Sequence, residues 1–223
     1  MLIIHEGLSR EAQALDEKIG KVFGFGNTVR EVDLRKEFRR MQGTPGFCHY
    51  PSGIQEEVPE MCSKKVMLLT GRDLYAGNSE QDDWIFGFHA GNLMVVSSAR
   101  MKGPDNKPRD RLEVPEELYL ARVVFIGIHE IGHDVVKARH YLPAVWINAR
   151  TGHRLEMGPH CTDNGCVMYE VVDIVAPPPE EGYMLLGDKK KFDTGIDEHL
   201  KIMRPDYFCE QCKPTIEISE AYH

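Results

Sequence analysis

The sequence contains no apolar run of about 18 residues, the length that a helix needs to cross a bilayer. Basic residues are outnumbered, because 27 lysines and arginines stand against 35 aspartates and glutamates, a formal net charge of −8. An acidic chain of this kind is not expected to bind nucleic acid or an anionic membrane. The first six residues lack a basic start and a continuous apolar core, so we predict no signal peptide and a cytoplasmic protein.

What is present is an ordinary globular composition. Of the 223 residues, 42% are hydrophobic and 28% are charged, which suits a single domain over residues 1–223 with a substantial core. Helical spacing of apolar residues predicts a helix over 8–23. Short apolar or alternating runs predict strands at the N-terminus and over 28–34, 65–70, 84–88 and 92–98. Glycines and prolines predict a long loop over 41–59.

The second half begins with a longer predicted helix. Pro115 and the two acids after it favour a helix start, and Pro143 stops the helix, so we expect it to run to about His140. A hairpin over 144–148 and 153–157 follows, then a proline-rich loop over 176–182 and a solvated lysine run over 189–191. The order βαβ, strands, helix and loop-rich tail predicts a mixed α/β (α+β) fold.

The long helix carries the sequence His-Glu-Ile-Gly-His over residues 129–133. Histidines four residues apart lie on one helical face, so His129 and His133 can reach the same metal ion. Glu130 would then face the fourth coordination position, where a zinc-bound water sits. Five-residue patterns also arise by chance, so this motif gains weight from the cysteines downstream.

Six cysteines are present, and four form two short-spaced pairs, Cys161 with Cys166 and Cys209 with Cys212. Such pairs are typical of tetrahedral thiolate zinc sites. Cys48 and Cys62 have no partner at such a spacing, and we expect them to be buried thiols that pack as small hydrophobic residues.

A catalytic zinc site needs a third protein ligand beside an open position. His160 is favoured because it follows the Gly158-Pro159 turn and adjoins a paired cysteine, and a glutamate is the main competitor. His140 would lie about 10 Å beyond His133 along a continued helix, so it could bind only if the helix broke first. The remaining histidines are expected at the surface or the chain end: His153, His199 and His223.

Together, His129-Glu130-xx-His133, His160-Cys161, Cys166-Val167-Met168 and Cys209-xx-Cys212 resemble the archaemetzincin family of the metzincin clan. The resemblance covers roughly residues 65–212. It implies a metzincin-like fold with a small mixed twisted sheet, an active-site helix and a loop-rich, zinc-stabilised C-terminal subdomain. The upper part would span about 1–133 and the lower part about 134–223.

The resemblance also implies two zinc ions. His129, His133 and His160 would bind a catalytic zinc, with Glu130 as general base and Met168 as the Met-turn beneath the metal. The second, structural zinc would be bound by four thiolates, from Cys161, Cys166, Cys209 and Cys212.

The sequence departs from the family pattern at two places. Arg139 and Val136 stand where the family has its third histidine and a helix-ending glycine, so reaching His160 takes about twenty extra residues. The stretch between Met168 and Cys209 is also longer, mainly around 177–191. We expect the helix to extend further past His133 than in relatives. Whether the 137–157 insertion forms a lid or blocks the cleft stays open.

The predicted function is peptide-bond hydrolysis. Zinc lowers the pKa of a bound water from about 15.7 toward ~7, and Glu130 would take its proton and pass it to the leaving amine. The 92–98 strand could align a peptide substrate if it edges the cleft. Asp134 could orient a ligand imidazole or be a surface acid. A catalytically silent zinc-binding protein and a hydrolase of another bond are the alternatives; neither substrate nor oligomeric state is predicted.

Overall fold

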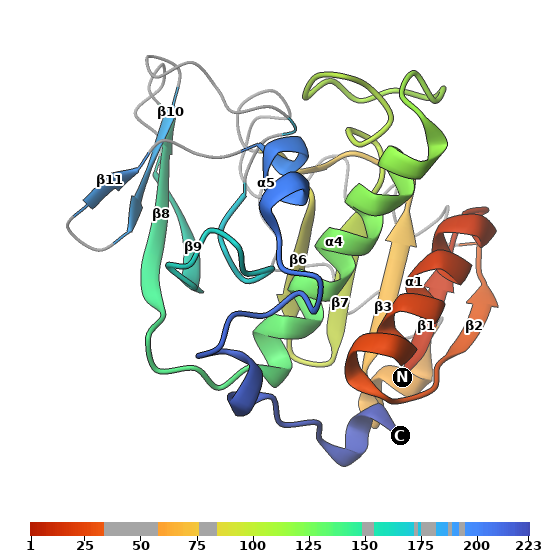
Figure 1. Ribbon diagram of the computed structural model, residues 1–223. Coiled ribbons are helices and arrows are strands. Elements are labelled where there is room, and N and C mark those ends of the chain that lie inside the picture. The colour runs from red at the N-terminus through yellow and green to blue at the C-terminus, as the bar shows by residue number, and fades with distance from the viewer. Residues whose placement is uncertain are drawn as a thin grey trace.

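The computed structural model describes residues 1–33, 58–75, 84–148, 154–171, 174, 182–186, 189–191 and 195–223. Its first layer is a five-stranded sheet in the order β2-β1-β3-β7-β6 (Figure 1). The strands are β1 (Leu2–His5), β2 (Thr28–Glu31), β3 (Val66–Thr70), β6 (Gly87–Ala90) and β7 (Leu93–Ser97). Pairing is parallel except between β6 and β7. The βαβ start and the mixed α/β class are confirmed.

One strand prediction needs correction. The 92–98 strand corresponds to β7, which pairs with both β3 and β6 and so is not an edge of this sheet. The predicted 84–88 strand divides into β5 (Trp84–Ile85), which pairs with β4 (Leu74–Tyr75), and β6. In the described part of the sheet the edge strands are therefore β2 and β6, and β6 is the one that packs against α4 beside Glu130.

Two helices cover one face of this sheet, α1 (Ser9–Phe23) and α4 (Glu116–Val135) (Figure 1). They approach closely at Gly127, where an added Cβ would lie 2.5 Å from a methyl of Leu15. Arg122, fully buried in α4, forms a bidentate ion pair with Asp197 and also donates to two backbone carbonyls. Asp197 lies in the short helix α5 (Ile196–Ile202), so this ion pair joins α5 to α4.

The helix α4 is shorter than predicted, ending at Val135 rather than near His140. Val136 is already extended, and it forms an antiparallel bridge with Ile216. Glu217 N–H donates to the Val135 carbonyl at 2.8 Å, and Lys137 N–H to the Thr215 carbonyl at 3.0 Å. The C-terminal segment thus satisfies backbone groups that another helical turn would have used. The expected extension of the helix past His133 is wrong for this reason.

A second, four-stranded antiparallel sheet has the order β11-β10-β8-β9. Its strands are β8 (Leu142–Asn148), β9 (Arg154–His160), β10 (Gly182–Leu186) and β11 (Lys189–Lys191). The predicted hairpin is confirmed as β8 and β9. The two segments that the resemblance marks as insertions, 137–157 and 177–191, meet in the pairing of β8 with β10 (Figure 1).

The chain ends lie side by side (Figure 1), and the C-terminal segment contains two short 3-10 helices, η3 (Lys213–Thr215) and η4 (Glu220–Tyr222). The Met1 amino group donates to the Tyr222 carbonyl, and the Tyr222 hydroxyl donates to Asp134 at 2.8 Å. Near β3, the 3-10 helix η2 (Pro59–Cys62) leaves Cys62 exposed, so its predicted burial is wrong. Cys48 and most of the predicted 41–59 and 176–182 loops lie outside the described residues. None of the described helices has the length and apolarity to cross a membrane.

Candidate metal centres

The three predicted histidines converge, and we call them the histidine centre. His129 and His133 project from α4, and His160 is the last residue of β9. Nε2 of His129 lies 3.1 Å from Nε2 of His133 and 3.2 Å from Nε2 of His160. Zinc–nitrogen bonds of about 2.0–2.1 Å at tetrahedral angles separate the nitrogens by about 3.3–3.4 Å. The three imidazoles therefore fit a zinc ion.

The second ring nitrogens hold these imidazoles in place. His129 Nδ1 donates to the Val167 carbonyl at 2.7 Å, and His160 Nδ1 donates to the Gly158 carbonyl at 3.1 Å. In these two rings Nε2 is then the nitrogen without a proton, and its lone pair can bind a metal ion. Burial, and next the neighbouring His160, lowers the pKa of His129 to about 4. Burial and then His129 also lower the pKa of His133. Both rings are thus neutral at pH 7, which is the form that binds metal.

Glu130 is buried between α4 and the edge strand β6. Burial raises the pKa of its carboxyl group well above the usual value, and the neighbouring carboxylate of Glu170 raises it further. Its Oε1 atom occupies the space beside Gly87, where an added Cβ would lie 2.7 Å from it. The absence of a side chain at Gly87 thus leaves room for the carboxyl group of Glu130. In this buried position the carboxyl group binds a proton more tightly than an exposed glutamate does.

The segment 166–170 lies directly beneath the histidine centre. Its Val167 carbonyl accepts a hydrogen bond from the ring of His129, and its Met168 carbonyl accepts one from Cys161 N–H. Met168 is fully buried, and its sulfur fills the space next to Gly132 inside the His-Glu-Ile-Gly-His motif. The structure thus places the Met168 side chain against α4 at Gly132, between the two histidines of the motif in sequence.

The sequence did not predict a role in the site for Glu170, which lies two residues after Met168. It is 4% exposed, and its Oε2 atom is paired with Nε2 of His160. Its residue type allows a ligand role, but the sequence holds no spacing signal, because the contact depends on how the 161–170 turn folds back toward β9.

The four paired cysteines also come together. Sγ of Cys161 lies 3.8 Å from Sγ of Cys209, and Sγ of Cys166 lies 3.7 Å from Sγ of Cys212. Zinc–sulfur bonds of about 2.3 Å at tetrahedral angles separate the sulfurs by about 3.8 Å. Amide groups of Asp163 and Cys209 each point at a sulfur from 3.4 Å, which favours the thiolate form. The cysteines therefore fit zinc as well.

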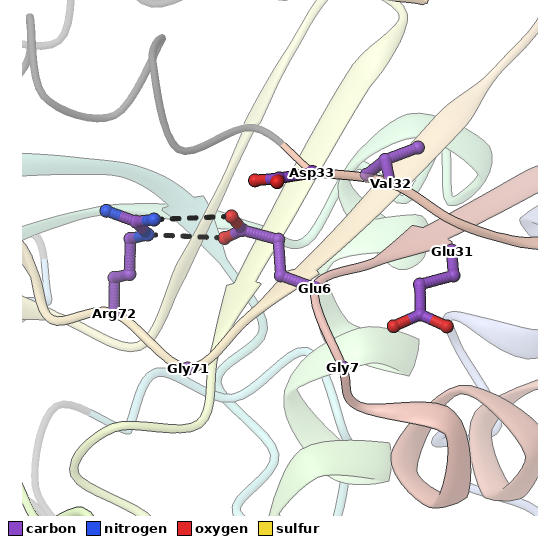
Figure 2. A pocket seen from close by; sticks show the side chains of 7 residues that line it. All are labelled: Glu6, Gly7, Glu31, Val32, Asp33, Gly71 and Arg72. Carbon is purple, nitrogen blue, oxygen red and sulfur yellow. Dashed lines mark hydrogen bonds and ion pairs between the residues drawn. The ribbon is translucent and has the colours of Figure 1, made fainter.

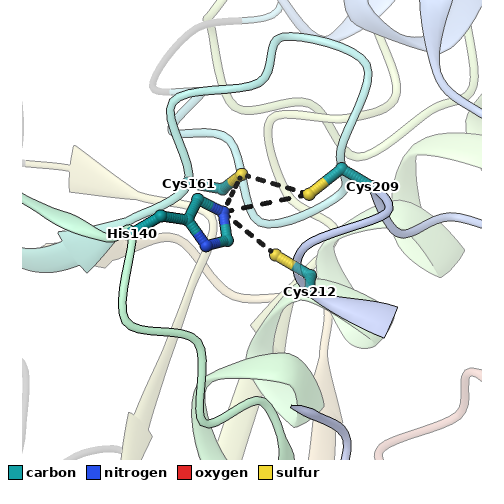
Figure 3. Close-up of side chains that lie close together, drawn as sticks. All are labelled: His140, Cys161, Cys209 and Cys212. Carbon is teal, nitrogen blue, oxygen red and sulfur yellow. Dashed lines mark hydrogen bonds between the residues drawn. The ribbon is translucent and has the colours of Figure 1, made fainter. Parts of the chain in front are cut away.

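His140 is an unpredicted fifth donor, and it lies close to three of these cysteines (Figure 3). Its Nε2 atom lies 3.1 Å from Cys161, 3.5 Å from Cys212 and 3.8 Å from Cys209. The early end of α4 makes this possible, because the chain leaves the helix at Val136 and His140 lies in the bend that precedes β8. We call His140 and the four cysteines the cysteine cluster. It borders an open hollow of about 410 Å³ whose lining includes Asp163, Arg204 and Cys209.

Other residues that the sequence brought into question lie elsewhere. His199 is fully buried rather than at the surface, because α5 packs it between Phe125 and Tyr169. The centroid of its ring lies 4.9 Å from that of Phe125 and 5.8 Å from that of Tyr169. Asp134 accepts hydrogen bonds from Lys65 and Tyr222, so it connects α4 to β3 and to the C-terminus. His223 is exposed at the chain end, and His153 lies outside the described residues.

A further hollow, of about 570 Å³, opens at the carboxyl ends of β1, β2 and β3 (Figure 2). It is lined by Glu6, Glu31 and Asp33 together with Arg72, which donates two hydrogen bonds to Glu6 at 3.3 and 3.4 Å. Three carboxylates and one guanidinium form this acidic hollow. Neither of the two metal-ligand groups found among the described residues lies in it.

No protein-family model matches the chain, and no curated protein matches it significantly. Among solved structures, an archaemetzincin from Archaeoglobus fulgidus, crystallised in complex with malonate, is similar with a TM-score of 0.53 at 21% identity. The match covers 97% of this chain and 100% of that one. For an archaemetzincin from Methanopyrus kandleri the TM-score is 0.46 at 20% identity, and the match covers 96% of this chain and 91% of that one. The chain therefore has an archaemetzincin-like fold, as the motif resemblance predicted.

Proposed function

We propose that this protein is a zinc metallopeptidase that hydrolyses peptide bonds at the histidine centre. The observation that carries the proposal is the convergence of three imidazoles, two of them from the helix that also carries the buried Glu130. The archaemetzincin-like fold supports it. His129, His133 and His160 would bind the ion. Zinc would supply a Lewis acid for the carbonyl and lower the pKa of water toward about 7.

Glu130 would carry the proton. Its raised pKa means that the carboxyl group holds a proton at a pH where an exposed glutamate would have lost it. The carboxylate form, which the positive charge of a bound zinc ion would favour, is a stronger base than an exposed glutamate, so it would accept a proton from the attacking water and release it to the departing amine nitrogen. Burial between α4 and β6 restricts it to one position, which favours both transfers in the same site.

The peptide would pair with β6. Gly87, the first residue of this edge strand, lies against Glu130, so a peptide added to the strand would pass the general base. Strand addition aligns an extended backbone through main-chain hydrogen bonds and leaves specificity to the side chains. In this arrangement β6 takes the role that the sequence analysis gave to the 92–98 strand.

A second zinc would bind in the cysteine cluster and stabilise the C-terminal part. Tetrahedral zinc accepts four ligands, and five donors are gathered here. Cys161, Cys209 and Cys212 would bind in any arrangement. The fourth ligand is Cys166 in the four-thiolate site that the resemblance implies, and His140 in the alternative.

The test compares three proteins with measured zinc content: wild type, Glu130→Gln and His133→Ala. We expect Glu130→Gln to keep both ions and to lose peptidase activity by about 10²–10⁴-fold, the usual contribution of general acid–base catalysis. His133→Ala should lose one ion and the activity together. The proposal is wrong if Glu130→Gln cleaves peptides at the wild-type rate.

One observation favours a second candidate, a catalytically silent zinc-binding protein. Glu170 already lies against the metal-facing nitrogen of His160. If wild type binds zinc in the histidine centre and cleaves no member of a random peptide library, this second function replaces the first.

A further inference from the structure

The carboxylate of Glu170 approaches the histidine centre from the side on which a metal would bind. His160 Nδ1 already donates to the Gly158 carbonyl, so its outward nitrogen is taken. Glu170 instead meets Nε2, the same atom that faces His129 Nε2 at 3.2 Å. A carboxylate that merely orients a ligand imidazole binds the nitrogen away from the metal. Glu170 does not have that geometry.

Burial supports the same assignment. Within the described residues the Oε2 atom of Glu170 has no hydrogen-bond partner, although the side chain is only 5% exposed and the atom pairs with His160. A second carboxyl group, that of Glu130, is also buried, on the helix that carries His129 and His133. Buried carboxylates are costly unless a cation or hydrogen bonds compensate them. A divalent ion among the three imidazoles would supply that compensation.

We propose that Glu170 is a fourth protein ligand of the metal in the histidine centre, where it takes the position otherwise left for water and substrate. The inference rests on the proposed function for the identity of the ion. Three imidazoles and one carboxylate complete a tetrahedral zinc site, which is the pattern of a closed site. Glu170 therefore acts as an inhibitor built into the chain, and substrate must displace it or bind as a fifth ligand.

The local fold keeps this inhibitor close to the ion. Cys161 N–H donates to the Met168 carbonyl at 2.9 Å, and Cys161 forms a parallel bridge with Tyr169. Cys161 follows His160 directly, so this pairing fixes the distance between His160 and Glu170. The turn that places Met168 under α4 thus also delivers the carboxylate to the ligand side of His160.

Calorimetric titration with acetohydroxamate, a small ligand that needs an open position on zinc, tests the proposal. Wild type, Glu170→Gln and Glu130→Gln are compared as zinc-loaded full-length proteins whose two ions per chain are verified. Glu130→Gln is the matched control, because it neutralises the other buried glutamate without freeing a position on the metal. We expect Glu170→Gln to bind the hydroxamate at least about tenfold more tightly than either other protein. Its zinc Kd should rise by about 10–100-fold or more, since even partners outside the coordination sphere are worth that much.

Glu170→Asp provides a second variant in case the amide disturbs folding. It keeps the charge but shortens the side chain by one methylene, so it should also bind the hydroxamate more tightly. Equal hydroxamate affinity in zinc-loaded wild type and both Glu170 variants overturns the inference and leaves the proposed function standing. Absence of zinc from the histidine centre in wild type overturns both.

Discussion

The histidine centre and the cysteine cluster lie in one molecule but are held in place by different means. Two of the three histidines belong to α4, which packs on both α1 and the five-stranded sheet, and backbone carbonyls hold the rings of His129 and His160. The cysteines lie in turns after β9 and in the C-terminal tail, and their sulfurs face one another at 3.7–3.8 Å. The first set is positioned by the fold. The second set lies in turns, where the nearest donors to its sulfurs are other thiols and His140.

This difference would separate the roles of the two metals proposed for these sites. A centre built on a packed helix keeps its shape without an ion, and its metal is free to serve chemistry. A set of thiols in turns gains its geometry from the ion, and zinc binding there contributes directly to folding free energy.

The largest expected effect is on stability, from Cys209→Ser. This substitution removes a thiolate from the cysteine cluster and should lower the free energy of unfolding by about 4 kcal/mol or more, in the range reached by loss of a structural metal. Urea unfolding monitored by circular dichroism measures it. His133→Ala, which removes a ligand from the histidine centre, is the matched control and should cost less than about 2 kcal/mol. If His133→Ala costs as much as Cys209→Ser, the contrast between the two sets is wrong.

Gly87→Ala should reduce peptidase turnover through the position of Glu130. The added Cβ would lie 2.7 Å both from Glu130 Oε1 and from the Val95 carbonyl, so either the carboxyl group or β6 must move. A displacement near 1 Å at a catalytic group costs about 10²-fold in kcat/KM. Steady-state cleavage of a peptide substrate measures this, with zinc content unchanged.

Gly71→Ala provides the comparison, because an added Cβ there meets no atom within 4 Å. Its turnover should equal that of wild type. Full activity in Gly87→Ala would show that Glu130 does not need its present position.

Gly132→Ala probes the contact between the helix and Met168. The added methyl group would collide with the Met168 sulfur. Such overpacking costs about 1–3 kcal/mol, against a gain of up to about 1 kcal/mol in helix propensity. We expect a net loss of about 1 kcal/mol or more in thermal unfolding, and non-additivity with Met168→Ala, which empties the contested space. Strict additivity of the two substitutions would mean that Met168 does not support the histidine centre.

Much of the architecture followed from local signals in the sequence. The helix over 8–23, the parallel strands around it and the β8–β9 hairpin were predicted from periodicity and turn residues, and the structure has them as α1, β1 to β3, β8 and β9. The convergence of His129 and His133 follows from a spacing of four residues on a helix. His160 lies 27 positions after His133, and it was favoured as the third ligand from the turn before it and the cysteine after it, in agreement with the archaemetzincin resemblance.

The failures all concern tertiary contacts. The helix should have continued past Val135 on propensity alone, but pairing of Val136 with Ile216 ends it and brings His140 to the cysteines. His199 was expected at the surface because its neighbours in sequence are polar, yet α5 turns it against Phe125. Glu170 had no signal at all. The partners that decide the first two cases are distant in the sequence, and Glu170 reaches His160 only through the fold of the 161–170 turn, so no local pattern contains these contacts.

The smallest effect we predict is in protons released on zinc binding at pH 7, measured by calorimetry in two buffers of different ionisation enthalpy. His129 and His133 have lowered pKa values and are already neutral, so the histidine centre should release at most about one proton, from Glu130, whose pKa is raised. In the cysteine cluster, hydrogen bonds with neighbouring thiols raise the pKa of Cys161 and Cys212. Both must lose a proton to become ligands, so this set should release at least about two. Variants that retain one site each, His133→Ala and Cys209→Ser, assign the two values; equal release would remove the electrostatic distinction between the centres.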